Sequence, residues 1–250
     1  CDFEPSRREP LPVPYLSTPP TAPIVLRPGR QLFVDDALIE FSSCSRRWHQ
    51  AQPYAGNPVL KPETPHELCG GECPVAAPFS DGVWYDPQDG LYKLFYHAGW
   101  FHGTALATSS DGIHWQRPEL GVVGNSNLLL PIRDNYERDG ALVWLDQHAK
   151  NADERWKMFI YNRYQNGAGG ELLASPDGYR WQYRCPCGPC GDNSSFYYDP
   201  FQQRWIFSIR VGFPGTGRAR AYLAREDFFA PPWHDVPLDQ GAGGDDMTPI

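Results

Sequence analysis

Acidic side chains recur at one point of a repeated sequence pattern, just before an alternating run of aromatic and aliphatic residues. When three similar segments are aligned without gaps, Asp139 and Asp192 fall at the same position. Asp81 lies two places later in its segment, and it points to the same face because side chains alternate along a strand. Glu72 lies just upstream of the first segment, and Asp246 stands where a fourth would begin. We therefore expect these carboxylates to converge on one site.

Carboxylates gathered in this way suit the cleavage of a glycosidic bond. One carboxylic acid protonates the leaving oxygen, while a second carboxylate acts as the nucleophile or activates a water molecule. Crowding separates the pKa values of such groups, so that one of them can hold a proton at neutral pH. The alternative is that each Asp caps a turn or binds a structural cation such as calcium. That alternative is favoured for any single Asp, whereas catalysis is favoured for the set. No other cofactor is expected.

Further candidate residues lie around this set. Asp36, in the stretch FVDDALIE, is a second candidate for the first carboxylate, although it could equally end a strand that closes a ring. His97 and His102 flank Trp100 on a predicted loop, where exposed rings bind the faces of sugars. Arg138 directly precedes one of the aligned acids. The expected catalytic residues are thus Asp139, Asp192, Asp81, Glu72 and Asp36, and the expected substrate-binding residues are Arg138, Trp100, His97, His102 and Asp246.

The elements that carry these residues form a repeat. In each copy a strand ends in Tyr-Asp or Leu-Asp, and a turn, an alternating aromatic strand and a strand of small residues follow. We predict the alternating strands at 92–96, 156–161 and 205–209, and the small-residue strands at 104–109, 171–175 and 218–224. In two copies the dipeptide Asp-Gly and a Trp then open a last strand. This order predicts a four-stranded antiparallel meander.

The spacing of the copies indicates the fold. They follow one another at about 50–60 residues, which is typical of the blades of a β-propeller and too long for one turn of a solenoid. A β-sandwich also has many short strands, but its strands have no reason to repeat the same order of turn, aromatic strand and Trp. We predict an all-β propeller at 24–250, with blades near 69–118, 137–184 and 190–237 and the start of a further blade at 242–250.

The ring would be incomplete in this 250-residue chain. Residues 30–60 would supply strands to another blade, but a propeller that lacks a sector leaves strand edges open. We therefore expect further residues of a longer chain, or a partner chain, to complete the ring.

The composition narrows the range of partners and locations. The formal net charge is -8 and no basic face is clustered, which argues against a nucleic-acid partner. No apolar run has the length of a membrane-spanning helix. Residues 1–23 are polar and rich in Pro, as expected of an extended tether. Cys1 resembles the lipid-bearing Cys of a mature bacterial lipoprotein, or else marks an arbitrary boundary. We expect an exported protein (periplasmic, extracellular or on the cell surface) that meets a membrane only through a lipid on Cys1.

Six other cysteines form an even set of the kind found in exported proteins with disulfides. They are Cys44, Cys69, Cys73, Cys185, Cys187 and Cys190. The stretch CPCGPC at 185–190 could instead bind a metal, but a zinc site needs a second pair of ligands, for which Cys69 and Cys73 are the visible candidates. We favour disulfides, whose connectivity the sequence leaves open.

Four stretches of the chain resemble a known group of enzymes. RQLFVDDALIE (30–40), NPVLKPETPHE (57–67), GVWYDPQDGLYKLFYHAG (82–99) and SSDGIHWQRPELG (109–121) are similar to predicted glycosyl hydrolases grouped with the family 32 and 43 propellers, which include invertases and arabinanases. The resemblance implies a five-bladed β-propeller of four-stranded antiparallel blades. It also implies a sugar in the axial pocket and three acidic residues from the first three blades.

Two motifs compare differently with this group. The Arg-Asp pair of the second blade is present as Arg138-Asp139, whereas the Asn-Asp-Pro-Asn start of the invertases is absent. Asp192 stands where the third blade of the group carries a Glu general acid. The expected function is a glycoside hydrolase that acts on a polysaccharide fragment. The alternative, favoured by the departure at Asp192, is a propeller that binds carbohydrate or assembles outside the cell without catalysis.

Overall fold

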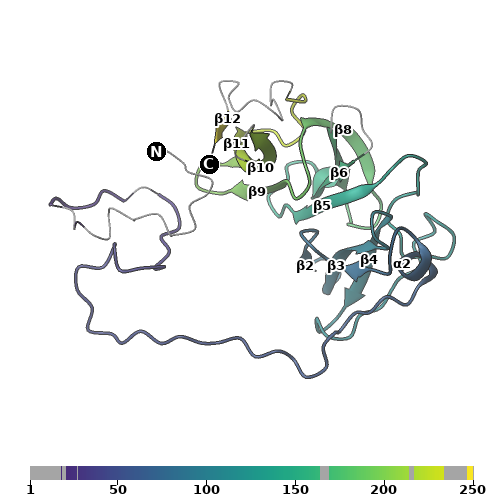
Figure 1. Ribbon diagram of the computed structural model, residues 1–250, viewed down its shortest axis with the longest axis horizontal. Coiled ribbons are helices and arrows are strands. Elements are labelled where there is room, and N and C mark those ends of the chain that lie inside the picture. Colours follow the sequence, from purple (N-terminus) through teal and green to yellow (C-terminus); the bar gives the residue numbers. More distant parts are fainter. Residues whose placement is uncertain are drawn as a thin grey trace. The chain divides into compact units, whose positions relative to one another are not determined.

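The computed structural model describes residues 18, 21–26, 28–163, 169–213, 217–233 and 247–249 (Figure 1). The chain divides into two compact units, Cys1–Tyr54 and Ala55–Ile250. In the first unit the described residues form bends and turns but neither helix nor strand. The predicted tether and lipid-bearing Cys1 lie almost wholly outside the described residues, so export stays a prediction.

The first sheet is built around the alternating strand β3 (Leu91–Ala98). β4 (Gly103–Ser109) pairs with one edge of β3 along its length, so the short strands β1 (Ala76–Ala77) and β2 (Val83–Asp86) share the other edge. The chain between β1 and β2 bulges away from β3. This bulge, residues 78–82, contains Asp81 and needs Gly82 at a positive φ of 109°.

The second and third sheets are the predicted four-stranded antiparallel meanders. The second runs β5 (Arg138–Leu145), β6 (Trp156–Asn162), β7 (Gly169–Ser175) and β8 (Gln182–Pro189). The third runs β9 (Ser195–Asp199), β10 (Arg204–Phe213), β11 (Gly217–Arg225) and β12 (Met247–Pro249). The alternating and small-residue strands predicted from the sequence are therefore confirmed as β3, β6 and β10 and as β4, β7 and β11.

Two predictions about the ends of the propeller were wrong. Met247–Pro249 pair with β11 and so form the fourth strand of the third sheet rather than the start of a further blade. Residues 30–60, expected to supply strands to another blade, contain no strand. That segment has few regularly alternating apolar positions, so it lacks the pattern that would hold a strand in a sheet.

Helices are short in the part of the chain that the structure describes. α2 (Pro65–Cys69) begins with a capping box, in which Thr64 and Glu67 satisfy each other's backbone N–H groups. η1 (Ala152–Glu154) is a single 3-10 turn between β5 and β6. Neither has the length or apolar character that a membrane-spanning helix requires.

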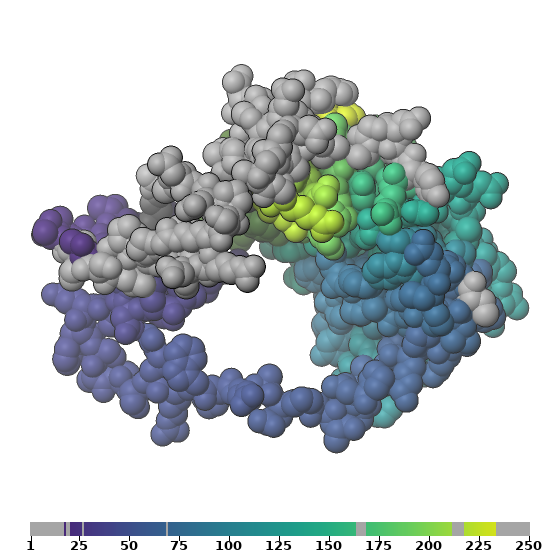
Figure 2. Space-filling model, viewed as in Figure 1, coloured from purple at the N-terminus to yellow at the C-terminus, as the bar shows by residue number. Residues whose placement is uncertain are grey.

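The apolar core lies between successive sheets. Alternate residues of β3 face opposite sides, so that Leu94 and Tyr96 join one cluster and Phe95 joins another with Val143 and Trp156 of the second sheet. A third cluster fills the space between the second and third sheets. Figure 2 shows residues of the first sheet, in blue, packed directly against teal residues of the second. Each sheet is therefore stabilised by burial against the next one along the chain.

The inner strands of the three sheets lie side by side. β2 contacts β5, and β5 contacts β9. The Trp84 indole N–H of β2 donates to the Val143 carbonyl at 2.8 Å, and the Val143 N–H donates to the Asp81 carbonyl, also at 2.8 Å. First strands that meet in this way, with later strands running outward, are the arrangement of propeller blades. The predicted all-β fold of four-stranded antiparallel sheets is confirmed, while a total of five blades stays a prediction.

The cysteines do not form the expected disulfides in the described part of the chain. Cys44, Cys73, Cys185, Cys187 and Cys190 are free thiols. A Cβ atom added at Gly170 would lie 2.5 Å from the Cys187 Sγ and 3.1 Å from the Cys190 Sγ, so both thiols pack tightly in the core. Within the described residues no three His, Cys, Asp or Glu side chains are grouped so as to hold a metal ion. A structural calcium therefore stays a prediction.

Candidate active site at the starts of the inner strands

Asp139 and Asp192, the two residues aligned in the sequence, lie close together. Asp139 is the second residue of β5, and Asp192 lies just before β9. The segments approach so closely that a Cβ added at Gly140 would lie 3.4 Å from the backbone nitrogen of Asn193. The prediction that these two acids, more than fifty residues apart in sequence, come to one place is therefore consistent with the structure.

A β-bulge sets the position of Asp139. Arg138 pairs with Asn162 of β6 and Gly140 with Tyr161, which leaves Asp139 as the extra residue. Such bulges interrupt the ladder and re-aim a side chain, and they are common beside active sites. The bulge gives Asp139 a half-buried side chain at the edge of the sheet, with 18% of its surface exposed.

Arginine side chains contact both acids. The Arg163 Nε atom lies 3.6 Å from the Asp139 carboxylate and 3.9 Å from that of Glu137. The Arg210 Nε atom lies 3.1 Å from the Asp192 carboxylate, and the Arg218 guanidinium is 3.5 Å from its other oxygen. The three carboxylates are thus matched by three guanidinium groups, and this charge balance allows the acids to gather.

The surroundings of Asp139 shift the pKa of its carboxyl group upward. Burial raises the pKa of its carboxyl group above the usual value, and the nearby charges of Asp192 and Glu137 raise it further. Arg163 and Arg138 oppose this effect only in part. A carboxyl group with a raised pKa beside another carboxylate is the arrangement expected of a general acid.

Aromatic rings border the acid cluster on the side of the first sheet. Phe79, in the bulge between β1 and β2, lies 5.3 Å from Trp100 between ring centroids, and Trp100 lies 4.8 Å from Phe101. The Arg163 guanidinium connects the two groups, since it lies 4.5 Å from the centroid of the Phe101 ring while it contacts Asp139. Phe79 is 59% exposed, so this cluster presents an aromatic side chain to solvent. Sequence reasoning missed Phe79 and Arg163, because a single Phe or Arg carries no chemical motif of its own.

The two predicted histidines have different surroundings. His97, at the end of β3, is buried beneath Phe79 and Trp100, and burial lowers its pKa to about 4. It is therefore a neutral ring that supports Trp100, and the prediction that it stacks on a sugar is not supported by its position. His102 stacks on His66 at 5.6 Å between ring centroids, and burial together with the charge of His66 lowers its pKa.

Asp81 and Arg138 are not available to a substrate, contrary to the prediction. They form an ion pair in which the side chains are 0% and 1% exposed. The Arg138 Nε–H also donates to the Thr104 hydroxyl at 3.2 Å. The alternation argument placed Asp81 on the pore face, but the bulge at 78–82 breaks the alternation and turns its side chain between the first two sheets. The pair joins the sheets directly beside Asp139.

The remaining predicted residues lie apart from the acid pair or outside the described chain. Glu72 is exposed, and its backbone N–H donates to the Trp100 carbonyl at 3.1 Å, so it borders the aromatic cluster. Asp36 belongs to the first unit, where it is exposed and pairs with Arg46. Asp246 lies outside the described residues.

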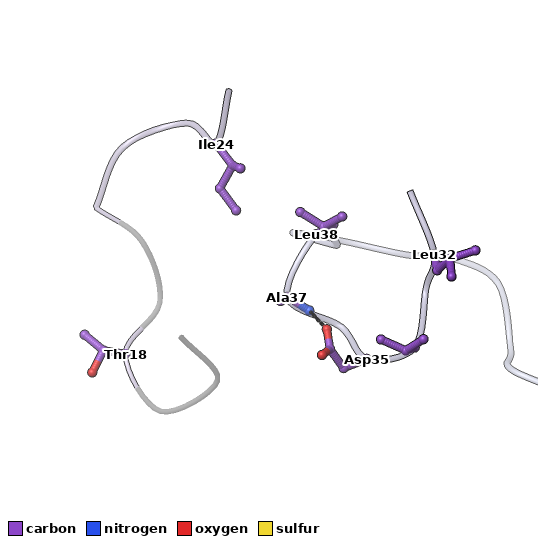
Figure 3. A pocket seen from close by; sticks show the side chains of 7 residues that line it. Thr18, Ile24, Leu32, Asp35, Ala37 and Leu38 are labelled. Atoms are coloured by element: carbon purple, nitrogen blue, oxygen red, sulfur yellow. Dashed lines mark hydrogen bonds between the residues drawn. The ribbon is translucent and has the colours of Figure 1, made fainter. Parts of the chain in front are cut away.

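The first unit has a cavity of its own. It has a volume of about 440 Å³ and is lined mainly by apolar side chains, including Ile24, Leu32 and Leu38 (Figure 3). Asp35 also borders it, and its carboxylate accepts a hydrogen bond from the Ala37 N–H at 2.9 Å. Asp35 therefore caps a turn, which is the alternative that the sequence left open for such residues.

The chain is similar to several solved structures. No protein-family model and no curated protein sequence matches the chain. It is similar to the fructofuranosidase from Schwanniomyces occidentalis complexed with fructose, at 16% identity and a TM-score of 0.46, over 60% of this chain and 32% of that one. A variant of that enzyme complexed with fructosylnystose gives 15% identity and a TM-score of 0.45, over 62% and 32% of the two chains.

A second kind of structure is also similar. An N-acetylgalactosamine deacetylase from F. plautii, in complex with blood group B trisaccharide, gives 20% identity and a TM-score of 0.34, over 52% of this chain and 40% of that one. The chain thus spans about a third of the length of the fructofuranosidases, and 40% of the deacetylase.

Proposed function

We propose that this protein is a glycoside hydrolase in which Asp139 and Asp192 act on one glycosidic bond. The observation that supports the proposal is the meeting of these two carboxylates at the starts of successive inner strands, with Asp139 held in a bulge where its pKa is raised. The exposed Phe79 ring and the neighbouring Trp100 offer a face on which a sugar ring can stack.

The surroundings assign different roles to the two acids. Asp139, whose pKa is raised, donates a proton to the leaving oxygen as the bond breaks. Asp192, contacted by Arg210 and Arg218, is the charged partner that attacks the sugar carbon or activates a water molecule. Arg163 holds the Asp139 carboxyl group in place beside the aromatic rings.

Hydrolysis of aryl glycosides with different leaving groups tests both roles. In a panel of aryl furanosides and pyranosides, Asp139→Asn should lower kcat by about 10²–10⁴-fold for phenyl glycosides. It should lower kcat much less for dinitrophenyl glycosides, because a good leaving group departs without a proton. Asp192→Asn should impair both kinds of substrate. Asp153→Asn is the matched control, since Asp153 is an exposed carboxylate in η1.

Two results would contradict the proposal. Equal losses for both leaving groups in Asp139→Asn would remove its role as the acid, provided that the variant keeps the Tm of the parent. If the parent cleaves no glycoside but binds oligosaccharides in calorimetry, the second candidate, a non-catalytic carbohydrate-binding propeller, takes its place. That candidate is favoured by the arginine contacts, which engage both acids in ion pairs.

A further inference from the structure

A cavity between the first and second sheets lies outside the acid cluster. It has a volume of about 200 Å³ and is lined by the start of β4, by β7, by the start of β8 and by the loop that leads to β5. Three aromatic side chains, Tyr136, Trp181 and Tyr183, form part of its wall. Tyr183 is 56% exposed, so the cavity is open to solvent.

An ion pair between Arg133 and Glu171 forms part of the wall of this cavity. The Arg133 guanidinium binds the Glu171 carboxylate through two contacts, 3.1 Å from Nη1 to Oε1 and 2.8 Å from Nη2 to Oε2. The same guanidinium lies 3.9 Å from the centroid of the Tyr136 ring. Because the two charges already match each other, an ionic ligand would have to separate a bidentate pair, whereas an uncharged ligand would leave it intact.

The Tyr136 hydroxyl is buried beside the Arg133 guanidinium, but it makes no hydrogen bond of normal geometry among the described residues. Leaving a buried hydroxyl unpaired is costly, and such groups in native proteins usually have a partner. Because the Tyr136 side chain lines the cavity, a small turn of its ring would bring this hydroxyl to a ligand hydroxyl and give it a partner of better geometry.

The cavity is connected to the proposed active site by two of its wall residues. His102 lies on the loop that carries Trp100 and Phe101, and Thr104 accepts the hydrogen bond from Arg138 that directly precedes Asp139. Thr104 and Arg138 are buried, so a chain of sugar units would reach the cavity over the loop that carries His102.

We propose that this cavity is a separate subsite for one neutral sugar unit of an oligosaccharide, remote from the bond that is cleaved; the inference rests on the proposed function. Aromatic faces for the C–H side of a sugar ring, together with a few placed polar groups, are what such a ligand requires. The volume is below the range of roughly 300–1,000 Å³ that is typical of pockets for larger ligands, which fits a single ring.

Calorimetry in the Asp139→Asn background tests the subsite, because binding is then measured without turnover. The probes are neutral furanose and pyranose oligosaccharides, each as a mono-, di-, tri- and tetrasaccharide. We expect at least one trisaccharide to bind more tightly than its monosaccharide. Tyr136→Phe should weaken trisaccharide binding by about 2–10-fold and leave monosaccharide binding unchanged.

Stability measurements separate a binding role from a structural one. Tyr136→Phe removes only a hydroxyl that makes no hydrogen bond of normal geometry, so its Tm should be close to that of the parent. Tyr183→Ala should weaken trisaccharide binding by about tenfold. Tyr85→Ala is the matched control, because Tyr85 is similarly exposed, at 51%, and lies outside the cavity. It should bind all probes like the parent.

The subsite is overturned if no oligosaccharide binds more tightly than its monosaccharide, or if Tyr136→Phe and Tyr183→Ala bind trisaccharides like the parent. These outcomes leave the proposed hydrolysis untouched when the aryl glycosides are cleaved. Conversely, chain-length-dependent binding that both variants weaken, in a protein that cleaves no glycoside, supports the subsite and contradicts the hydrolase.

Discussion

Arg138 and Asp139 are neighbours in the sequence but have opposite surroundings. Arg138 is buried and paired with Asp81, while Asp139 lies half-buried among Arg163, Glu137 and Asp192. Successive side chains of a strand point to opposite faces, and the bulge at Asp139 adds to this difference. Arg138 therefore joins the first two sheets, whereas Asp139 remains accessible for chemistry.

Arg163 is the residue that limits the pKa of Asp139. Its charge lowers a pKa that burial and two carboxylates raise, so Arg163→Met should raise the pKa of Asp139 further. The acid would then stay protonated to higher pH, and the alkaline limb of the kcat/KM profile should move upward. Carboxyl ¹³C chemical shifts, recorded against pH, measure the same change without activity. Arg180→Met, which alters an exposed arginine, should leave both curves in place.

At the scale of elements, the repeated Asp at the end of β2 and just after β5 has a structural role. Asp86 and Asp146 each bind a lysine of the following strand, Lys93 at 2.7 Å and Lys157 at 2.8 Å. Each lysine also lies over a Trp ring of the next sheet, 5.2 Å from Trp156 for Lys93 and 5.1 Å from the Trp205 ring for Lys157. These two Asp–Lys pairs thus join one sheet to the next, at the end opposite to the acid cluster.

Removal of one of these lysines should weaken the contact between sheets. Lys93 is 1% exposed and also donates to the Asp177 carbonyl at 2.8 Å. Its ammonium group also pairs with the Asp89 carboxylate at 2.8 Å. Lys93→Met would therefore leave three acceptors short of a donor, although Arg155 still pairs with Asp86. We expect a loss of about 2–4 kcal/mol in the free energy of unfolding, measured by denaturant titration. Lys150→Met, at an exposed position, should change it by less than about 0.5 kcal/mol. Equal effects of the two substitutions would rule out this role for the ion pair.

For the second unit as a whole, buried ionisable groups connect stability to pH. Burial lowers the pKa of His97 to about 4, so the unfolded chain binds a proton at higher pH than the folded chain does. Burial alone would raise the pKa of Glu67 and Asp86, but ion pairs and hydrogen bonds lower both. Each of these shifts favours the folded state at neutral pH and loses that effect in acid.

The expected result is a Tm that is highest near neutral pH and falls in two stages. From about pH 6.5 to 4 the fall comes from His97, which lowers the free energy of unfolding by roughly 3 kcal/mol. Below about pH 4 protonation of the carboxylates lowers it further. His97→Phe should flatten the first stage only. His148→Phe, at an exposed position, should not change the curve. A first stage that persists in His97→Phe would show that another group causes it.

Local pattern was sufficient to predict the strands and to align Asp139 with Asp192. Alternation and turn residues act over a few neighbours, and a repeat imposes the same geometry on each copy. The same reasoning failed for Asp81, because the bulge at 78–82 depends on pairing with β3, and for His97, whose burial depends on rings from two other segments.

The sequence by itself determined the repeating unit: the order of turn, aromatic strand and small-residue strand, and the matched positions of two acids. Only the tertiary structure decided which acids are free, because burial and ion pairing depend on residues far apart in the chain. Asp81 meets Arg138 and Asp139 meets Arg163 through packing between strands and sheets, and that packing sets their charge and access to solvent.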